Sequence, residues 1–220
     1  NLSSRQLICL SSRPFVNSSS RQLIINSSIR QLISLPTIAL IESNLTVLNV
    51  DGGEDYRLRT LRPAEIFFVP NNEENEQKLA ALFKEMSGIS ELNPGISIIH
   101  GREIPHKAQS ERAIWFDFRA LCFGPRSQAD YLYLAEHYEM VFLSGLERLT
   151  PQEKAEARRL TWLIDVLYDF RVKLCATSAV GVNDIYVKGD FAEEFTRTAS
   201  RMIEMQSEVY LEQLHLTLSK

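Results

Sequence analysis

Three segments between residues 140 and 176 follow one another as strand, helix and strand, and this order limits the folds open to the chain. Residues 140–143 are all apolar and form a short run, which is typical of a buried strand. Residues 172–176 form a second strand-like run directly after the helical segment, apolar except for Lys173. Two strands joined through a helix lie parallel in one sheet, with the helix on its face. The segment therefore predicts an α/β fold.

The helix between these strands carries the clearest local signal in the chain. Thr150-Pro151-Gln152-Glu153 fits a capping box, with threonine at the N-cap, proline at the first helical position and glutamate closing the box. The apolar residues that follow recur at intervals of three and four as far as residue 170, and they form one stripe: Leu160, Leu163, Ile164 and Leu167.

From residue 37 onward the rest of the chain also alternates between strand and helix patterns. Further strands are expected over residues 45–50, 64–69, 96–99 and 113–118. Helices are expected over residues 73–86, 127–138 and 191–214, the first of them closed by Gly88. With 220 residues, of which 45% are hydrophobic, the chain can bury a core. We expect a mixed sheet with helices packed on it.

Residues 1–36 differ from the remainder in charge and in repetition. They contain four arginines and no acidic residue, the first acid being Glu42. Since the whole chain has a net charge of −4, the +4 of this leader leaves −8 on residues 37–220. The hexapeptide Ser-Ser-Arg-Gln-Leu-Ile occurs at residues 3–8 and 19–24, with looser copies at 11–16 and 27–33.

Three interpretations of the leader are open. An arginine- and serine-rich start without acids is typical of an organellar transit peptide, although such peptides are not usually copies of one hexamer. A solenoid needs repeats of about 20 residues or more. We favour a low-complexity extension with little packed structure before Pro36. The predicted domains are this leader, 1–36, and a second region, 37–220, which is strand-rich over 37–100 and α/β over 101–220.

Composition and motifs exclude several functional classes. The chain has no run of about 18 apolar residues, the length needed to span a bilayer. Its net negative charge provides no basic surface field that would attract nucleic acid.

The cysteines and histidines show no metal-binding spacing, so we expect no metal site. No glycine precedes a lysine, and GxGxxG is absent, so the chain contains neither a phosphate loop nor a Rossmann fingerprint. Asp117, at the end of an apolar run, could present a carboxylate to Mg²⁺ or cap the next turn, and we favour the cap.

Two arginines share one face of the predicted last helix. Arg197 and Arg201 are four residues apart and therefore neighbours on that face. One interpretation is solvated ion pairs with acids of the same helix, namely Glu193, Glu204 and Glu208. The other is a guanidinium pair that meets phosphate at a domain or subunit border, because the planar guanidinium can bind an oxyanion through two N–H groups.

Six segments together resemble one protein family. They are residues 55–57 (Asp-Tyr-Arg), 101–104 (Gly-Arg-Glu-Ile), 116–122 (Phe-Asp-Phe-Arg-Ala-Leu-Cys), 124–131 (Gly-Pro-Arg-Ser-Gln-Ala-Asp-Tyr), 157–169, which begins Ala-Arg-Arg-Leu, and 197–207, which begins Arg-Thr-Ala-Ser-Arg. In this order they are similar to the C-terminal half of the ZapE/AFG-type P-loop ATPases, a family of bacterial cell-division ATPases and of mitochondrial relatives such as the lactation-elevated protein. The resemblance runs from Pro36 to Leu211.

The resemblance implies an AAA-like P-loop fold and an ATP hydrolase that uses ATP and Mg²⁺. For bacterial members it implies a cytoplasmic protein that remodels a protein partner, the division-ring polymer, at the inner face of the membrane. For mitochondrial members it implies protein quality control. A homo-oligomer is possible, and no transmembrane segment is expected. Because residues 197–201 match the family segment, Arg197 and Arg201 become candidate catalytic residues that sense γ-phosphate in cis or from a neighbouring subunit.

The chain also departs from the family pattern. In the family the phosphate loop, the Mg²⁺ carboxylates and the first sensor segment precede the Asp-Tyr-Arg segment, where this chain has its leader. We therefore expect a truncated or divergent member that neither binds ATP tightly nor hydrolyses it alone, since phosphoryl transfer depends on groups that position and neutralise the phosphates. The alternative is a non-catalytic protein-interaction module.

Overall fold

The computed structural model describes residues 22–24, 46–48 and 66–216. The chain divides into two compact units, residues 1–54 and 55–220. In the first unit, β1 (Gln22–Ile24) and β2 (Thr46–Leu48) pair in parallel, and β2 lies within the strand predicted over 45–50. The remainder of the leader and the Asp-Tyr-Arg segment lie outside the described residues, so the domain boundary at residue 36 stays a prediction.

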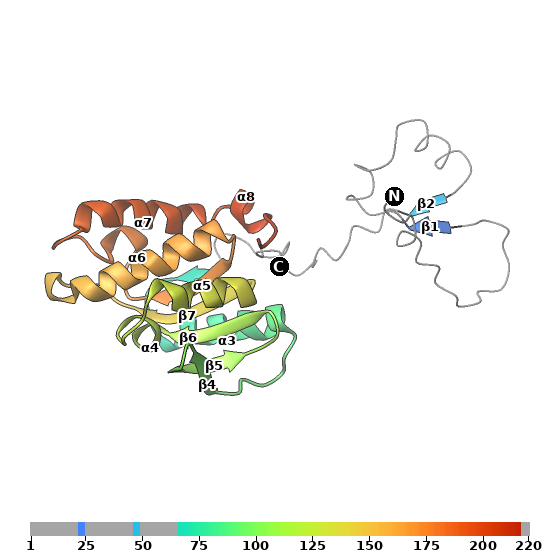
Figure 1. Ribbon diagram of the computed structural model, residues 1–220, viewed down its shortest axis with the longest axis horizontal. Coiled ribbons are helices and arrows are strands. Elements are labelled where there is room, and N and C mark those ends of the chain that lie inside the picture. The colour runs from blue at the N-terminus through green and yellow to red at the C-terminus, as the bar shows by residue number, and fades with distance from the viewer. Residues whose placement is uncertain (1–21, 25–45, 49–65, 217–220) are drawn as a thin grey trace, which may run out of the picture. The chain divides into compact units, whose positions relative to one another are not determined.

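The second unit is built on a six-stranded mixed sheet with the strand order β3-β8-β7-β6-β5-β4 (Figure 1). The first four of these strands are parallel, and β5 and β4 run antiparallel at one end of the sheet. The α/β class and the mixed sheet are therefore confirmed. In chain order the strands are β3 (Phe67–Phe68), β4 (Gly95–Ile99), β5 (Arg102–Gln109), β6 (Ala113–Asp117), β7 (Met140–Leu146) and β8 (Lys173–Ser178).

Helices cover both faces of this sheet. Successive residues of a strand point to opposite faces, so each buried strand contributes side chains to both layers of core. In β6, Ile114 and Phe116 join the core beneath most of the helices, whereas Trp115 joins the core beneath α3. In Figure 1, α7 lies over α6 as an outer layer. The helices are α3 (Glu73–Ser87), α4 (Phe118–Cys122), α5 (Gln128–His137), α6 (Lys154–Asp169), α7 (Ala192–Glu204) and α8 (Glu208–Leu211), with short 3₁₀ helices η3 (Pro151–Glu153) and η4 (Val182–Asp184).

The strongest sequence signals are confirmed. β7, α6 and β8 form the predicted crossover, and the two strands pair in parallel. Thr150 and Glu153 form the capping box, although its first turn is the 3₁₀ helix η3 rather than α-helix. Gly88 ends α3 with a φ of 71°, a left-handed conformation that glycine adopts without a Cβ clash.

Several predicted elements are wrong in extent. Of the strand expected over 64–69, the described residues form only β3, Phe67–Phe68. The helix expected over 191–214 is broken into α7 and α8, because the Ser207 hydroxyl accepts a hydrogen bond from Tyr210 N at 3.2 Å and starts a new helix. The strand expected over 113–118 ends at Asp117, and Phe118 already belongs to α4. β5 and α4 had no counterpart among the predicted elements.

Candidate functional site

The two candidate arginines lie together on α7 and face α6. Both donate to Asp165 of α6: Arg201 Nη1 lies 2.5 Å from Oδ1, and Arg197 Nη2 lies 3.2 Å from Oδ2. Within the described region neither arginine forms an ion pair with an acid of α7 or α8. Their acidic partner therefore comes from the neighbouring helix, and the expectation of partners on the same helix was wrong.

The two arginines differ in exposure and in the number of contacts that their side chains make. The Arg201 side chain is 25% exposed, lies 3.9 Å from a carboxylate oxygen of Asp169, and places its guanidinium 4.9 Å from the ring centroid of Tyr168. The Arg197 side chain is 66% exposed and holds Asp165 at the longer distance. Arg201 thus ties α7 to α6, whereas Arg197 keeps N–H groups open to solvent.

A cavity of about 130 Å³ lies beside Arg197, between α6, α7 and the segment that precedes α7. Aromatic side chains line part of it (Trp162, Tyr186, Phe191 and Phe195), and so do the acidic residues Asp165 and Glu194. Arg158 also lines it, with its guanidinium 4.0 Å from the ring centroid of Phe191 and 3.9 Å from a Glu194 oxygen. Small-molecule pockets usually measure about 300 to 1,000 Å³, so this cavity is small for a nucleotide.

Phe191 forms the rim of this cavity in a strained conformation. It is the N-cap of α7, and its φ of 69° lies in the left-handed region. For a residue with a side chain this region costs about 1 to 2 kcal/mol. The ring packs against Arg158 and places that guanidinium at the cavity. Arg158 and Arg197 therefore line one small cavity together with aromatic and acidic side chains.

Asp117 has the structural role that we favoured. It ends β6, and its Oδ1 accepts a hydrogen bond from Arg119 N at 2.9 Å, which caps α4. Among the residues that the structure describes, no group of three or more histidine, cysteine, aspartate and glutamate side chains could hold a metal ion.

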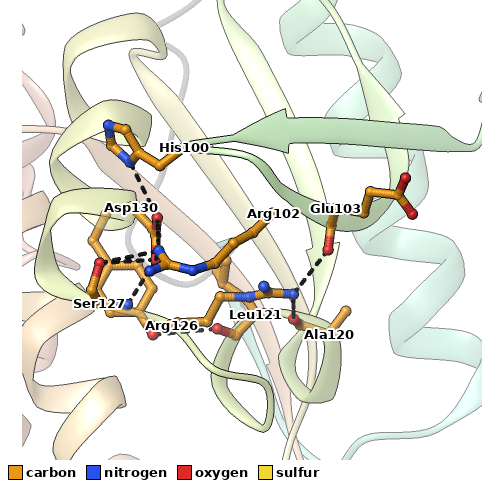
Figure 2. A network of polar contacts seen from close by, with 9 residues as sticks. His100, Arg102, Glu103, Ala120, Leu121, Arg126, Ser127 and Asp130 are labelled. Carbon is orange, nitrogen blue, oxygen red and sulfur yellow. Dashed lines mark hydrogen bonds and ion pairs between the residues drawn. The ribbon is translucent and has the colours of Figure 1, made fainter.

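A network around Asp130 joins two of the family segments (Figure 2). The Asp130 side chain is fully buried, and its carboxylate accepts from Arg102 Nη1 at 2.6 and 2.7 Å and from Ser127 N at 2.7 Å. His100 Nδ1 lies 3.2 Å from the same carboxylate. Burial raises the pKa of Asp130, but hydrogen bonds from Ser127, His100 and Arg102 outweigh it and lower the pKa. The network fixes the start of α5 against the β4–β5 turn.

Two further arginines hold the segment around α4 by its backbone. Arg126 Nη2 donates to the carbonyl oxygens of Glu103 and Ala120, each at 3.2 Å, as Figure 2 shows. Arg159 Nη1 donates to the carbonyl oxygen of Cys122 at 2.9 Å. In the family segments that the structure describes, the charged residues thus bind mainly to one another and to backbone, which gives them a structural role.

A polar cluster at the carboxyl ends of β7 and β8 was not predicted. Glu76 of α3 accepts from Lys107 Nζ at 2.6 Å, from Ser144 Oγ at 2.7 Å and from Thr177 Oγ1 at 3.1 Å. Burial raises the pKa of the Glu76 carboxyl, but these hydrogen bonds outweigh it and lower the pKa. The sequence shows Glu76 only as one of three acids in a first helical turn, so nothing in it pointed to the cluster.

A buried lysine was missed as well, although the sequence held a signal for it. Lys173 stands in the otherwise apolar run of β8, and its Nζ donates to the carbonyl oxygens of Tyr210 at 2.9 Å and Gln213 at 2.6 Å. Burial lowers the pKa of Lys173 to about 8. The lysine thereby holds α8 and the residues after it against the sheet.

No helix in the described part of the chain has both the length and the apolar character needed to cross a membrane.

Comparison with known proteins gives one consistent family. The AFG1-like ATPase family matches residues 14–214. Cell division protein ZapE of Escherichia coli K12 is 35% identical over 182 residues, which cover 83% of this chain and 48% of that protein. An uncharacterized protein of Schizosaccharomyces pombe is 33% identical over 156 residues, covering 69% of this chain and 34% of its own length.

A vertebrate protein is also similar to this chain. Lactation elevated protein 1 homolog B of Danio rerio is 24% identical over 211 residues, covering 80% of this chain and 42% of that protein. The chain thus spans less than half the length of each of these relatives. No solved structure gives a significant match. Since the family match extends over most of the 220 residues, the chain belongs to the AFG1-like ATPase family.

Proposed function

We propose that this chain contributes to the ATPase cycle of its family through Arg197, which would contact the γ-phosphate of ATP, with Arg201 as the positioning residue. The observation that carries the proposal is the contrast between the two side chains. Arg201 is held between Asp165, Asp169 and Tyr168, whereas Arg197 is mostly exposed. A guanidinium in that state can exchange a solvent-exposed contact for an oxyanion.

The surroundings of Arg197 fit a phosphoryl group rather than a whole nucleotide. The adjacent cavity of about 130 Å³ has a second guanidinium, that of Arg158, on its wall. The chain has no Gly-Lys pair, so groups outside it must bind the other phosphates and Mg²⁺. We infer that Arg197 acts on ATP held by another part of an intact protein or by a neighbouring subunit, where a guanidinium can neutralise charge in the transition state.

At the level of the cell, we propose that ATP hydrolysis by the intact protein is coupled to remodelling of a protein partner. Identity of 35% with a protein named for cell division supports the bacterial division ring as that partner and the cytoplasm as the location. The mitochondrion is the lesser alternative, and it follows from the resemblance to the lactation-elevated proteins.

A second candidate function is a non-catalytic module that docks a partner protein or an intact homologue. The absence of a Gly-Lys pair from the chain favours it, because no phosphate loop can form from these residues. Under this alternative, partner binding by the intact protein would be the same with and without nucleotide, whereas the ATPase proposal predicts that nucleotide changes it.

The test is turnover of an intact relative, E. coli ZapE, with the equivalents of Arg197→Gln and Arg201→Gln. We expect the first to lower the ATP turnover number about tenfold or more without a change in melting temperature, the usual effect of losing a charge-stabilising group. The second should lower both turnover and melting temperature, because it removes a structural ion pair. Unchanged turnover in the Arg197→Gln equivalent would overturn the proposal and favour the non-catalytic module.

A further inference from the structure

In the part of the chain that the structure describes, the outer edge of β4 has no partner strand. Among the strands that the structure describes, β4 is the last of the six-stranded sheet and pairs with β5 alone (Figure 1). The five residues of β4 therefore present one row of backbone N–H and C=O groups to β5 and another row to the margin of the sheet. Such an edge is a ready template for another strand.

The β4–β5 turn determines which residues face outward. His100 and Gly101 form a two-residue loop, and both have positive φ, as in a type I′ hairpin. The flanking pair, Ile99 and Arg102, is therefore hydrogen-bonded, and so is every second pair beyond it. Ile96 falls opposite Pro105, which has no N–H to donate, and this agrees with the alternation. The N–H and C=O groups of Ile96 and Ile98 consequently point to the open edge.

The same two residues also expose their side chains. Ile96 is 60% exposed and Ile98 is 69% exposed, and both lie on one face because they are two residues apart. β4 has no charged residue and no proline, and the irregularity in this part of the sheet lies between β5 and β6. Within β4 itself, therefore, no charge, proline or bulge prevents pairing.

We propose that β4 pairs in antiparallel fashion with β4 of a second copy of this chain, centred on Ser97. In this register Ile96 lies opposite Ile98 of the second copy, and Ile98 lies opposite its Ile96. Both pairs consist of residues with outward-facing backbone groups, so each exchanges two N–H···O bonds. A register centred on Ile96 would instead place Ile98 opposite Pro94, which has no N–H. The edge is therefore complementary to itself, which favours a second copy over an unrelated partner.

Charge and size agree with this pairing. The four isoleucine side chains would gather on one face, and no charged residue of one β4 would oppose a charge on the other. Glu103, the cross-strand neighbour of Ile98, lies on β5, so the two β4 strands separate it from Glu103 of the second copy. Stable interfaces bury about 1,200 Å² or more, whereas one five-residue strand from each copy makes a small contact, so we expect a weak dimer with a dissociation constant on the order of 100 μM. This inference does not depend on the proposed role of Arg197.

The first test is sedimentation velocity of the full 220-residue chain between about 5 and 500 μM, a range that spans the expected dissociation constant. The wild type should pass from monomer to dimer. Ile98→Lys should weaken association at least about tenfold, because it places a charge in the isoleucine cluster. The matched control is Val209→Lys, since Val209 is 73% exposed and lies on α8, and it should associate like the wild type. Melting temperatures should be the same in all three proteins.

A second variant tests the register. Ser97 has no outward-facing backbone group, so the two copies of Ser97 would form a close, non-hydrogen-bonded pair with Cα atoms about 4.5 Å apart, within reach of a disulfide. Ser97→Cys in a Cys9→Ser background should form a disulfide-linked dimer on mild oxidation, since Cys122 and Cys175 are buried. A wild type that remains monomeric, equal association of Ile98→Lys and Val209→Lys, or a Ser97→Cys variant that does not cross-link would each overturn the proposal.

Discussion

At the scale of single residues, identical side chains one helical turn apart have different surroundings. Arg197 and Arg201 share Asp165, yet Arg201 also packs on Tyr168 and is mostly covered. Sequence spacing could place both arginines on one face of a helix. It could not identify Asp165 as their partner, because that contact depends on how α6 and α7 pack.

This difference should be visible in stability. Arg201→Gln in this chain should lower the free energy of unfolding by about 1 to 2 kcal/mol, since it breaks a partly buried ion pair. Arg197→Gln should change it by less than about 0.5 kcal/mol, as is usual for an exposed pair. Urea denaturation of both variants gives the comparison. Equal losses would contradict the assignment of a structural role to Arg201 alone.

The buried carboxylate of Asp130 predicts a dependence of stability on pH. Burial would raise its pKa, but the hydrogen bonds from Ser127, His100 and Arg102 lower it below 3.8, the ordinary value. Between these two pKa values the unfolded chain binds a proton that the native state does not, so stability falls as pH falls. The stabilisation from this group is complete above about pH 5 and is lost as pH falls through the native pKa.

Asp130→Asn tests this assignment. The variant should be less stable than the wild type by about 2 to 3 kcal/mol at pH 7, because Arg102 loses a charged acceptor. Its stability should then fall less than that of the wild type between about pH 5 and pH 3. Urea denaturation at several pH values measures both effects. An identical acid dependence in the two proteins would show that Asp130 is not responsible.

At the scale of secondary-structure elements, local signals predicted most of the fold. The capping box at Thr150, the stripe of α6 and the apolar runs of β7 and β8 depend on neighbouring residues, so the sequence alone was sufficient. β5 was missed because it carries Pro105 and several polar side chains that hide the strand pattern. The break between α7 and α8 was missed because tertiary contacts favour it, notably those that Lys173 makes with Tyr210 and Gln213.

The break between these helices gives a prediction at the same scale. Ser207 caps α8 by accepting from Tyr210 N, so Ser207→Ala should lower the free energy of unfolding by about 1 kcal/mol. Ser200→Ala is the matched control, because Ser200 is exposed within α7, where alanine favours the helix. Thermal denaturation distinguishes the two variants. A continuous helix through residue 207 would instead be stabilised by alanine at both positions.

At the scale of the whole molecule, most charged residues of the family segments stabilise the fold. Arg102 binds Asp130, Arg159 binds the backbone at Cys122, and Arg201 binds Asp165. The sequence could identify these segments but not distinguish structural residues from functional ones, because the distinction depends on contacts between distant parts of the chain. Arg197 combines membership of a family segment with an exposed side chain and an adjacent cavity.

We propose that this chain supplies an arginine to an ATPase and does not itself hold the nucleotide. Calorimetric titration of the purified chain with ATP and Mg²⁺, with intact E. coli ZapE as the positive control, tests it most directly. We predict no binding to the chain at nucleotide concentrations up to about 1 mM, because the chain has no phosphate loop. Binding with a dissociation constant of about 10 μM or lower would contradict the account, since it would place a nucleotide site within these 220 residues.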